Sequence, residues 1–169
     1  MPSQSAQPGT AEQMKQKAAY SQVDELATWS RWVPFADAIK DAPLLPGVYL
    51  FRTPDSHQIV YVGHAGERAG GRKPEGIRGR LNIYRSGKGA TSGFGEAVLD
   101  RALTDETFVS QQLADLRHGN AKRTKEWARD SLAWLAAEIC WTISPDKSSA
   151  AALEKRIELI LRAHVLWNR

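Results

Sequence analysis

Two short runs of β-branched and aromatic residues lie close together in the first half of the chain. They cover residues 47–52 and 58–63, and turn-forming residues at 53–56 separate them. Runs of this composition joined by turn residues are typical of the two strands of a hairpin. A third apolar run at residues 136–143 predicts a further strand. The pattern therefore predicts three strands, of which the first two are neighbours along the chain.

Apolar residues at helical spacing predict helices in much of the remaining chain. In the segment after the hairpin, Ile77, Leu81 and Tyr84 fall on one face. Arg80 precedes Tyr84 by four residues, so these two side chains lie one above the other on the helix. Thr104 is a candidate N-cap further along. The expected helices cover about residues 11–29, 75–86, 94–103, 106–116, 121–135 and 144–164.

The length of the chain indicates one domain. A chain of 169 residues is long enough for one sizeable core and short for two. Residues 1–10 are small and polar, and we expect them to be disordered. Residues 11–169 are expected to form the domain. Within it, residues 11–45 form a helical extension, and its aromatic segment, residues 29–35, is expected to pack across the outside of the core.

The composition is that of an ordinary globular chain. Hydrophobic residues make up 42% of it and charged residues 25%. No apolar run approaches the length of a membrane span, and the first residues lack the apolar segment of a secretory signal. The single cysteine, Cys140, lies in an apolar run and is typical of a buried thiol in a reducing compartment. We therefore expect a cytoplasmic protein without a membrane partner.

Positive charge is concentrated in two blocks of the chain. Residues 64–88 hold seven Lys and Arg against two carboxylates, and residues 117–129 hold five against one, although the formal net charge is only +4. The glycine-rich start of the first block, residues 64–72, contains neither a P-loop nor a dinucleotide fingerprint, and we expect a flexible lead into the next helix. Two basic blocks favour a polyanion, with nucleic acid ahead of an anionic membrane surface. Two solvated faces are the alternative.

Five short motifs follow one another between residues 47 and 168. They are Gly47-Val48-Tyr49, Tyr61-Val62-Gly63, Arg80-Leu81-(x)2-Tyr84, Ala152-Leu153-Glu154 and Trp167-Asn168. In this order and at this spacing they resemble the GIY-YIG nuclease family, and are particularly similar to the N-terminal nuclease domain of the bacterial nucleotide-excision-repair endonuclease. No single motif is specific, so the combination carries the resemblance. It divides the domain into a nuclease core, residues 46–89 and 136–169, and a helical insertion, residues 90–135.

The resemblance implies an α/β fold of the α+β type, with a small three-stranded antiparallel sheet flanked by helices. It also implies a metal-dependent endonuclease that hydrolyses phosphodiester bonds, with DNA as the first expected substrate. Tyr49 and Tyr61 would be the paired phenols, and Glu154 the metal-binding carboxylate. The expected catalytic residues are Tyr49, Tyr61, His64, Arg80, Tyr84 and Glu154. His64 stands where the excision-repair relatives carry lysine, which leaves open the group that activates a phenol.

These residue types suit phosphodiester cleavage independently of the resemblance. Arg80 offers phosphate a planar and permanently charged fork of donors. Glu154 is a suitable ligand for Mg²⁺ or Mn²⁺, because Mg²⁺ keeps most of its waters and takes a phosphate oxygen as a further ligand. A cation or metal can lower the pKa of a phenol, so Tyr49 is expected to act as the general base. His64 would relay the proton or orient the reacting groups.

Each of these expectations has a structural alternative. Tyr49 and Tyr61 are also compatible with half-buried strand aromatics, and Arg80 with Tyr84 is compatible with a surface stacking pair. Glu154 is compatible with ordinary surface charge. On the same fold, a non-catalytic nucleic-acid-binding module or a protein-interaction module that docks through its tryptophans is the alternative function. The residues expected to contact nucleic acid are Arg78, Lys88, Lys122, Arg123, Lys125, Arg129 and Asn168.

Overall fold

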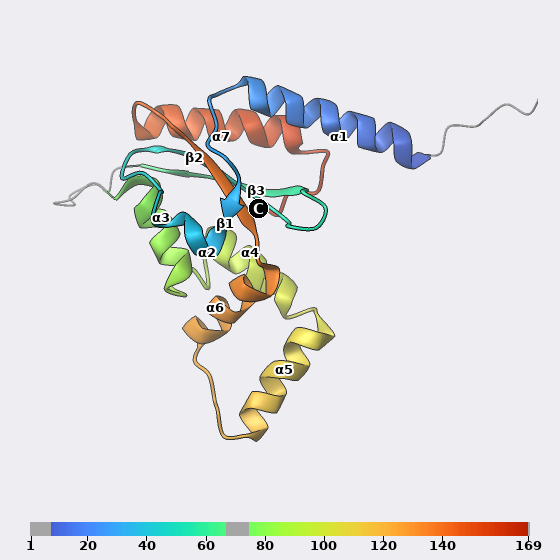
Figure 1. Cartoon of the computed structure of the whole chain (residues 1–169), viewed down its shortest axis with the longest axis vertical. Coiled ribbons are helices and arrows are strands. Elements are labelled where there is room, and N and C mark those ends of the chain that lie inside the picture. The colour runs from blue at the N-terminus through green and yellow to red at the C-terminus, as the bar shows by residue number, and fades with distance from the viewer. Residues whose placement is uncertain (1–7, 67–74, 169) are drawn as a thin grey trace, which may run out of the picture.

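The computed structural model describes residues 8–66 and 75–168 of the chain (Figure 1). Its elements, in chain order, are α1 (Pro8–Glu25), β1 (Val33–Pro34), α2 (Phe35–Ala38), β2 (Gly47–Arg52), β3 (Ile59–Ala65), α3 (Gly76–Arg85), α4 (Gly93–Ala102), α5 (Glu106–Arg117), α6 (Thr124–Leu135), β4 (Glu138–Ile143) and α7 (Lys147–Leu161). The predicted disorder of residues 1–7 and most of the predicted flexible lead at 64–72 lie outside the described residues, but His64 and Ala65 of that lead belong to β3. Among the described helices, none has both the length and the apolar character of a membrane span.

The strands form one antiparallel sheet in the order β1-β4-β2-β3. The α+β class is confirmed, but the described residues form a 4-stranded sheet where three strands are expected. The additional strand is β1, in which Val33 pairs with Ile139 and Pro34 pairs with Glu138. Two residues give no alternating pattern, so the sequence does not predict this strand. Proline lacks a backbone N–H, and its position at the sheet edge is where a strand tolerates that loss.

The aromatic segment at residues 29–35 is part of the sheet and the core rather than an outer accessory element. Ser30 and Trp141 extend the pairing beyond β1, since the Ser30 backbone N–H donates to the Trp141 carbonyl at 2.8 Å. The Trp141 N–H in turn donates to Ser30 Oγ at 3.0 Å. Phe35 follows β1 and is buried, with its ring centre 5.5 Å from that of Phe51. The prediction that this segment lies outside the core is therefore wrong.

The central strand, β2, is buried on both faces. Tyr49 and Phe51 point into one apolar cluster, and Val48 and Leu50 point into another on the opposite face. Side chains alternate between the faces of a strand, so two buried faces require an almost continuous apolar run. This explains why β2 reads as Gly-Val-Tyr-Leu-Phe without polar alternation.

Helices cover the two faces of the sheet. α1 and α7 lie side by side over one face, and α2, α3 and α4 lie on the other (Figure 1). α6 packs against α4, while α5 extends away from the sheet toward the bottom of the view. The tyrosine-bearing face of the hairpin is therefore enclosed by α3 and α4.

The helical segment at residues 90–135 is joined to the sheet through its first helix, α4. Phe94 of α4 is fully buried, and its ring stacks on that of Phe51 with the centres 3.6 Å apart. Val98, one turn further on, is also fully buried in the same cluster. α4 therefore completes the core on the face where the tyrosines lie.

Three helix starts differ from the predicted positions. α1 begins at Pro8, so residues 8–10 are helical rather than disordered, and proline suits a first helical turn. The N-cap of α5 is Asp105 rather than Thr104, and α7 begins at Lys147, after its N-cap Asp146, rather than at residue 144. Each aspartate accepts a hydrogen bond of 2.7 Å from a backbone N–H of the first turn. A carboxylate also interacts favourably with the positive end of the helix dipole.

Candidate active site

Tyr49 and Tyr84 form a buried hydrogen-bonded pair at the base of the site. Their hydroxyl groups lie 2.9 Å apart, and each residue is 1% exposed. Gly63 lies opposite Tyr49 in the β2–β3 register, and a Cβ at Gly63 would overlap the tyrosine ring. The glycine of the second motif is therefore required for the Tyr49 ring to cross the neighbouring strand.

The two hairpin phenols differ in their access to a ligand. Burial is the main cause that raises the pKa of Tyr49 well above its ordinary value, and the neighbouring Tyr84 and Tyr61 add to the rise. Burial and Tyr84 also raise the pKa of Tyr61, while Arg80 opposes this rise. Tyr61 lines a cavity, whereas Tyr49 is enclosed. Tyr61 is thus the hairpin phenol placed to meet a substrate.

Arg80 lies beside these tyrosines on α3. Its guanidinium carbon is 5.5 Å from the centre of the Tyr84 ring. Within the described part of the chain, its Nε is the buried side-chain polar atom that has no hydrogen-bond partner. Burial opposes the charge of Arg80, but Tyr84 and Tyr49 outweigh it and raise the pKa of Arg80 above its ordinary value. A fixed cation with an unsatisfied donor is suited to bind an anion such as phosphate.

The start of α4 contributes to the site, and sequence reasoning does not identify it. Gly93 has φ of 56°, and a Cβ there would lie 2.8 Å from the Tyr84 hydroxyl and 3.2 Å from the Tyr61 hydroxyl. The Phe94 backbone N–H donates to the Tyr84 hydroxyl at 3.4 Å. Only glycine combines this backbone conformation with so close an approach. The available signal is the Ser92-Gly93 pair at a predicted helix start.

His64 of β3 and Glu154 of α7 form a hydrogen-bonded pair. The distance between His64 Nδ1 and Glu154 Oε2 is 2.5 Å. The side chains are 28% and 18% exposed, so the pair is partly shielded from water. The fold therefore brings together two predicted site residues that are 90 positions apart in the chain. A carboxylate bonded to one ring nitrogen fixes the orientation of the imidazole.

A cavity of about 290 Å³ adjoins this pair and is lined by Tyr61, Glu154 and a second glutamate, Glu158. Burial and the charge of Glu154 raise the pKa of Glu158. Asn168 partly offsets this effect, since its Nδ2 donates to Glu158 Oε1 at 2.9 Å. Two carboxylates at one cavity create a negative potential that favours a cation.

The donor set at this cavity fits Mg²⁺ or Mn²⁺. Among residues 8–66 and 75–168, no group of three or more His, Cys, Asp or Glu side chains is placed to hold a metal ion. Mg²⁺ is commonly bound through one or two carboxylates, with water and substrate phosphate supplying the other ligands. Glu154, with Glu158 beside it, matches that mode of binding rather than a cage made entirely of protein ligands.

Asn168 fastens the C-terminal segment to the edge of β3. Its Oδ1 accepts from the Val62 N–H at 3.1 Å, and its Nδ2 donates to the Val62 carbonyl at 2.7 Å. The Trp167 N–H donates to the Val60 carbonyl at 2.6 Å. These bonds satisfy backbone groups that an edge strand otherwise leaves open. The amide of Asn168 is used within the protein, which favours a supporting role over the predicted contact with nucleic acid.

Arg78 and Lys88, two predicted nucleic-acid contacts on or near α3, have different surroundings. Arg78 Nε donates to the Ala42 carbonyl at 2.6 Å, and this bond ties α3 to the segment before β2. Lys88 is exposed and lines a larger cavity that also includes Arg80. Of the two, Lys88 is therefore better placed to meet a ligand.

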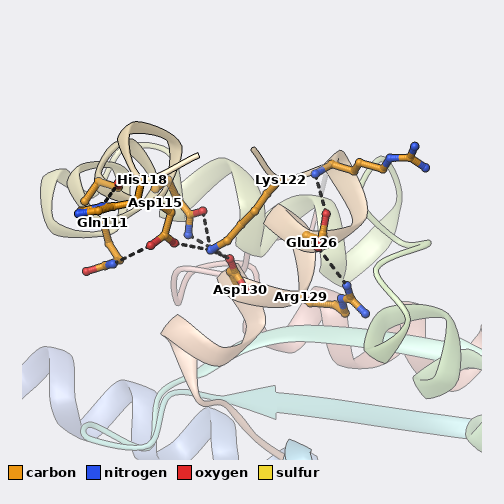
Figure 2. Close-up of polar contacts among 10 residues, drawn as sticks. Gln111, Asp115, His118, Lys122, Glu126, Arg129 and Asp130 are labelled. Atoms are coloured by element: carbon orange, nitrogen blue, oxygen red, sulfur yellow. Dashed lines mark hydrogen bonds and ion pairs between the residues drawn. The ribbon is translucent and has the colours of Figure 1, made fainter. Parts of the chain in front are cut away.

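The second basic block is partly neutralised by neighbouring carboxylates (Figure 2). Lys122 Nζ lies 2.6 Å from Asp115 and 2.7 Å from Asp130, which links the end of α5 to α6. Arg129 lies 4.0 Å from Glu126. The phosphate contacts expected of Lys122, Arg123, Lys125 and Arg129 remain predictions. Lys122 is the least suited to such a contact, because its ammonium group already has two carboxylate partners.

The structure brings the predicted catalytic residues together in three groups. Arg80 and His64 line the larger cavity, Tyr61 and Glu154 line the smaller one, and Tyr49 with Tyr84 forms the buried base. Comparison of the chain with protein-family models, curated proteins and solved structures found no match.

Proposed function

We propose that the chain is a metal-dependent endonuclease of the GIY-YIG type that hydrolyses phosphodiester bonds, with DNA as the first substrate. The observation that carries this proposal is the His64–Glu154 hydrogen bond, which joins a cavity containing Arg80 to a cavity containing Tyr61. Cleavage of a phosphodiester requires charge stabilisation at phosphate, an oriented water and a proton carrier. Side chains suited to each requirement surround this hydrogen bond.

Arg80 stabilises the reacting phosphate in this proposal. Arg80 lines the larger cavity, so its guanidinium can meet a phosphate oxygen there. Its position beside the Tyr84 ring restricts the movement of the guanidinium. A donor held in place before the reaction costs little reorganisation when charge develops on the phosphate oxygens.

Glu154 is the residue proposed to hold Mg²⁺ or Mn²⁺. One of its oxygens, Oε2, is bonded to His64, which fixes the direction of the carboxylate at the cavity. When bound, the metal would stabilise charge on the phosphate and on the leaving oxygen. Glu158 lines the same cavity and adds negative potential there.

Tyr61, rather than Tyr49, is the phenol proposed to meet the substrate, and its role is to orient water. The Tyr49 phenol is buried against Tyr84, and its pKa is raised well above the ordinary value, which makes it a poor proton acceptor. Tyr61 lines the cavity with Glu154, so its hydroxyl is placed to orient a water molecule. Tyr49 supports the site through its hydrogen bond to Tyr84.

His64 is the proposed proton acceptor. Imidazole is the usual proton carrier near neutral pH. Glu154 orients the His64 ring through Nδ1, and the ring also lines the larger cavity beside Arg80. In the proposed step the oxygen of water bonds to phosphorus and the bond to the leaving sugar oxygen breaks. The proton of the water passes to His64, and the leaving oxygen takes a proton from solvent.

Conversion of supercoiled plasmid to the nicked form tests this function. We expect the wild-type protein to nick plasmid in Mg²⁺ and to lose this activity in EDTA. Glu154→Ala removes the proposed metal ligand, so it should bind DNA and fail to cut, whereas Glu12→Ala on the exposed side of α1 should cut normally. A panel of duplex, single-stranded and branched DNA and of RNA then identifies the substrate. If wild type binds these substrates and cuts none with Mg²⁺ or Mn²⁺, the chain is a binding module instead.

A further inference from the structure

The larger cavity beside the site is strongly cationic. Its volume is about 1030 Å³, and His64 lines it, whereas Glu154 and Glu158 line the smaller cavity. Four of the side chains that line it are Lys or Arg, namely Arg80, Arg85, Lys88 and Lys147, against one carboxylate, Glu75. They come from α3, from the turn after α3 and from the first residue of α7. Three separate segments therefore direct positive charge to one groove, which we call the cationic groove.

The charges of this groove are available to a ligand. Within residues 8–66 and 75–168, Arg85, Lys88 and Lys147 form no ion pair with a carboxylate, and all three are exposed. Lys122 in the second basic block is, by contrast, held between Asp115 and Asp130. Arg85, Lys88 and Lys147 are therefore less compensated than Lys122.

Lys147 occupies a defined place at the mouth of the groove. It is the first residue of α7, and Asp146 caps the helix by accepting the Ser149 N–H at 2.7 Å. The aliphatic stem of Lys147 lies against Gly66, because a Cβ at Gly66 would overlap its Cβ, Cγ and Cδ atoms. The positive end of the α7 dipole adds to the charge of the ammonium group at this point.

The groove is continuous with the proposed active site. Arg80 lines the groove and also lies beside the phenols, and His64 lines the groove while bonding Glu154 of the other cavity. The two cavities differ in charge, since the smaller one is lined by Glu154 and Glu158. A polyanion that reaches Arg80 is therefore attracted on the groove side and repelled on the carboxylate side.

We infer that the cationic groove binds the nucleic-acid backbone on one side of the scissile phosphate, with Arg85, Lys88 and Lys147 contacting consecutive phosphates. This inference rests on the proposed function, and it adds the side of the scissile phosphate on which the substrate is held. Substrate binding should depend on nucleotides on the groove side of the cut and much less on nucleotides on the other side. Because phosphate contacts carry no base information, the groove binds without strong sequence preference.

Equilibrium binding of a labelled oligonucleotide in EDTA, where cleavage is absent, tests the groove. Lys147→Glu and Arg85→Glu should weaken binding, and each removed phosphate contact should lower the slope of log affinity against log salt by about one. Lys15→Glu on the exposed face of α1 makes the same change of charge away from the groove and should bind as wild type does. All the substituted residues are exposed, so the variants are expected to fold.

Cleavage kinetics separate this inference from the proposed function. Lys147→Glu should raise KM and leave kcat close to that of wild type, because it contacts substrate away from the reacting bond. If wild type cuts but both groove variants bind and cut like wild type, the groove inference is wrong and the function stands. If wild type binds in a groove-dependent way but never cuts, the function fails and the groove stands.

Discussion

Tyr49 and Tyr61 carry the same phenol on paired strands, but their surroundings give them different chemistry. Tyr49 is enclosed and bonded to Tyr84, whereas Tyr61 reaches the cavity of Glu154. The sequence motif treats the two residues as equivalent halves of one pattern. Packing separates the two residues, because Tyr49 lies against Tyr84 of α3, whereas Tyr61 packs against Phe94 of α4 and still lines the cavity.

Removal of each hydroxyl should therefore have a different effect. Tyr61→Phe should lower the single-turnover cleavage rate by roughly 10²-fold or more, because the oriented water is lost. Tyr49→Phe should affect the rate less, and it should cost about 1 kcal/mol of unfolding free energy because Tyr84 loses a buried partner. Oligonucleotide cleavage and urea denaturation measure the two effects. The reverse order of rates would assign the orientation of water to Tyr49 instead.

At the scale of elements, the ion pairs of Lys122 link α5 to α6 and neutralise part of the second basic block. Hydrogen bonds to Asp115 and Asp130 raise the pKa of Lys122, and the bond to Lys122 lowers the pKa of Asp115 (Figure 2). These side chains are still partly open to water, so each pair contributes modestly. Their main consequence is geometric, because they hold the outer end of α5 against α6.

Lys122→Met should loosen α5 in a pH-dependent way. The lowered pKa of Asp115 means that the ion pair stabilises the folded state above the ordinary Asp pKa, near 3.9. That contribution is lost as pH falls through the lowered value, so the difference between variant and wild type should disappear in acid. Hydrogen exchange of the α5 amides at neutral and acidic pH measures this difference between variant and wild type. Lys125→Met on α6 is the matched control, and equal exchange in both variants would contradict the account.

At the scale of the whole molecule, the sequence predicts the positions of helices and strands better than the contacts between them. The glycines at 47 and 63 and the apolar runs beside them mark β2 and β3, and the period of α3 places Arg80 and Tyr84 on one helix. β1 is not predictable because its two residues are a strand only through pairing with β4.

Contacts between distant parts of the chain explain two further features that the sequence does not predict, the packing of the insertion and the balance of charge. The insertion appears separate in sequence, although Phe94 stacks on Phe51 and Gly93 approaches both site phenols. Local charge counts also mislead, because the carboxylates that offset Lys122 lie seven and eight residues away on adjoining helices. Lys147, by contrast, adds its charge to the groove from the start of a distant helix.

The groups around Arg80 are proposed to form a phosphodiester-cleaving site. The rate of plasmid nicking by Arg80→Met measures whether they do. Methionine keeps much of the side-chain volume and removes the guanidinium. We expect the wild type to nick plasmid in Mg²⁺ and the nicking rate of Arg80→Met to be lower by roughly 10²- to 10³-fold. Arg31 is an exposed arginine, and Arg31→Met should cut at the wild-type rate. Equal rates for wild type and Arg80→Met, or a wild type that does not nick DNA, would contradict the proposed site.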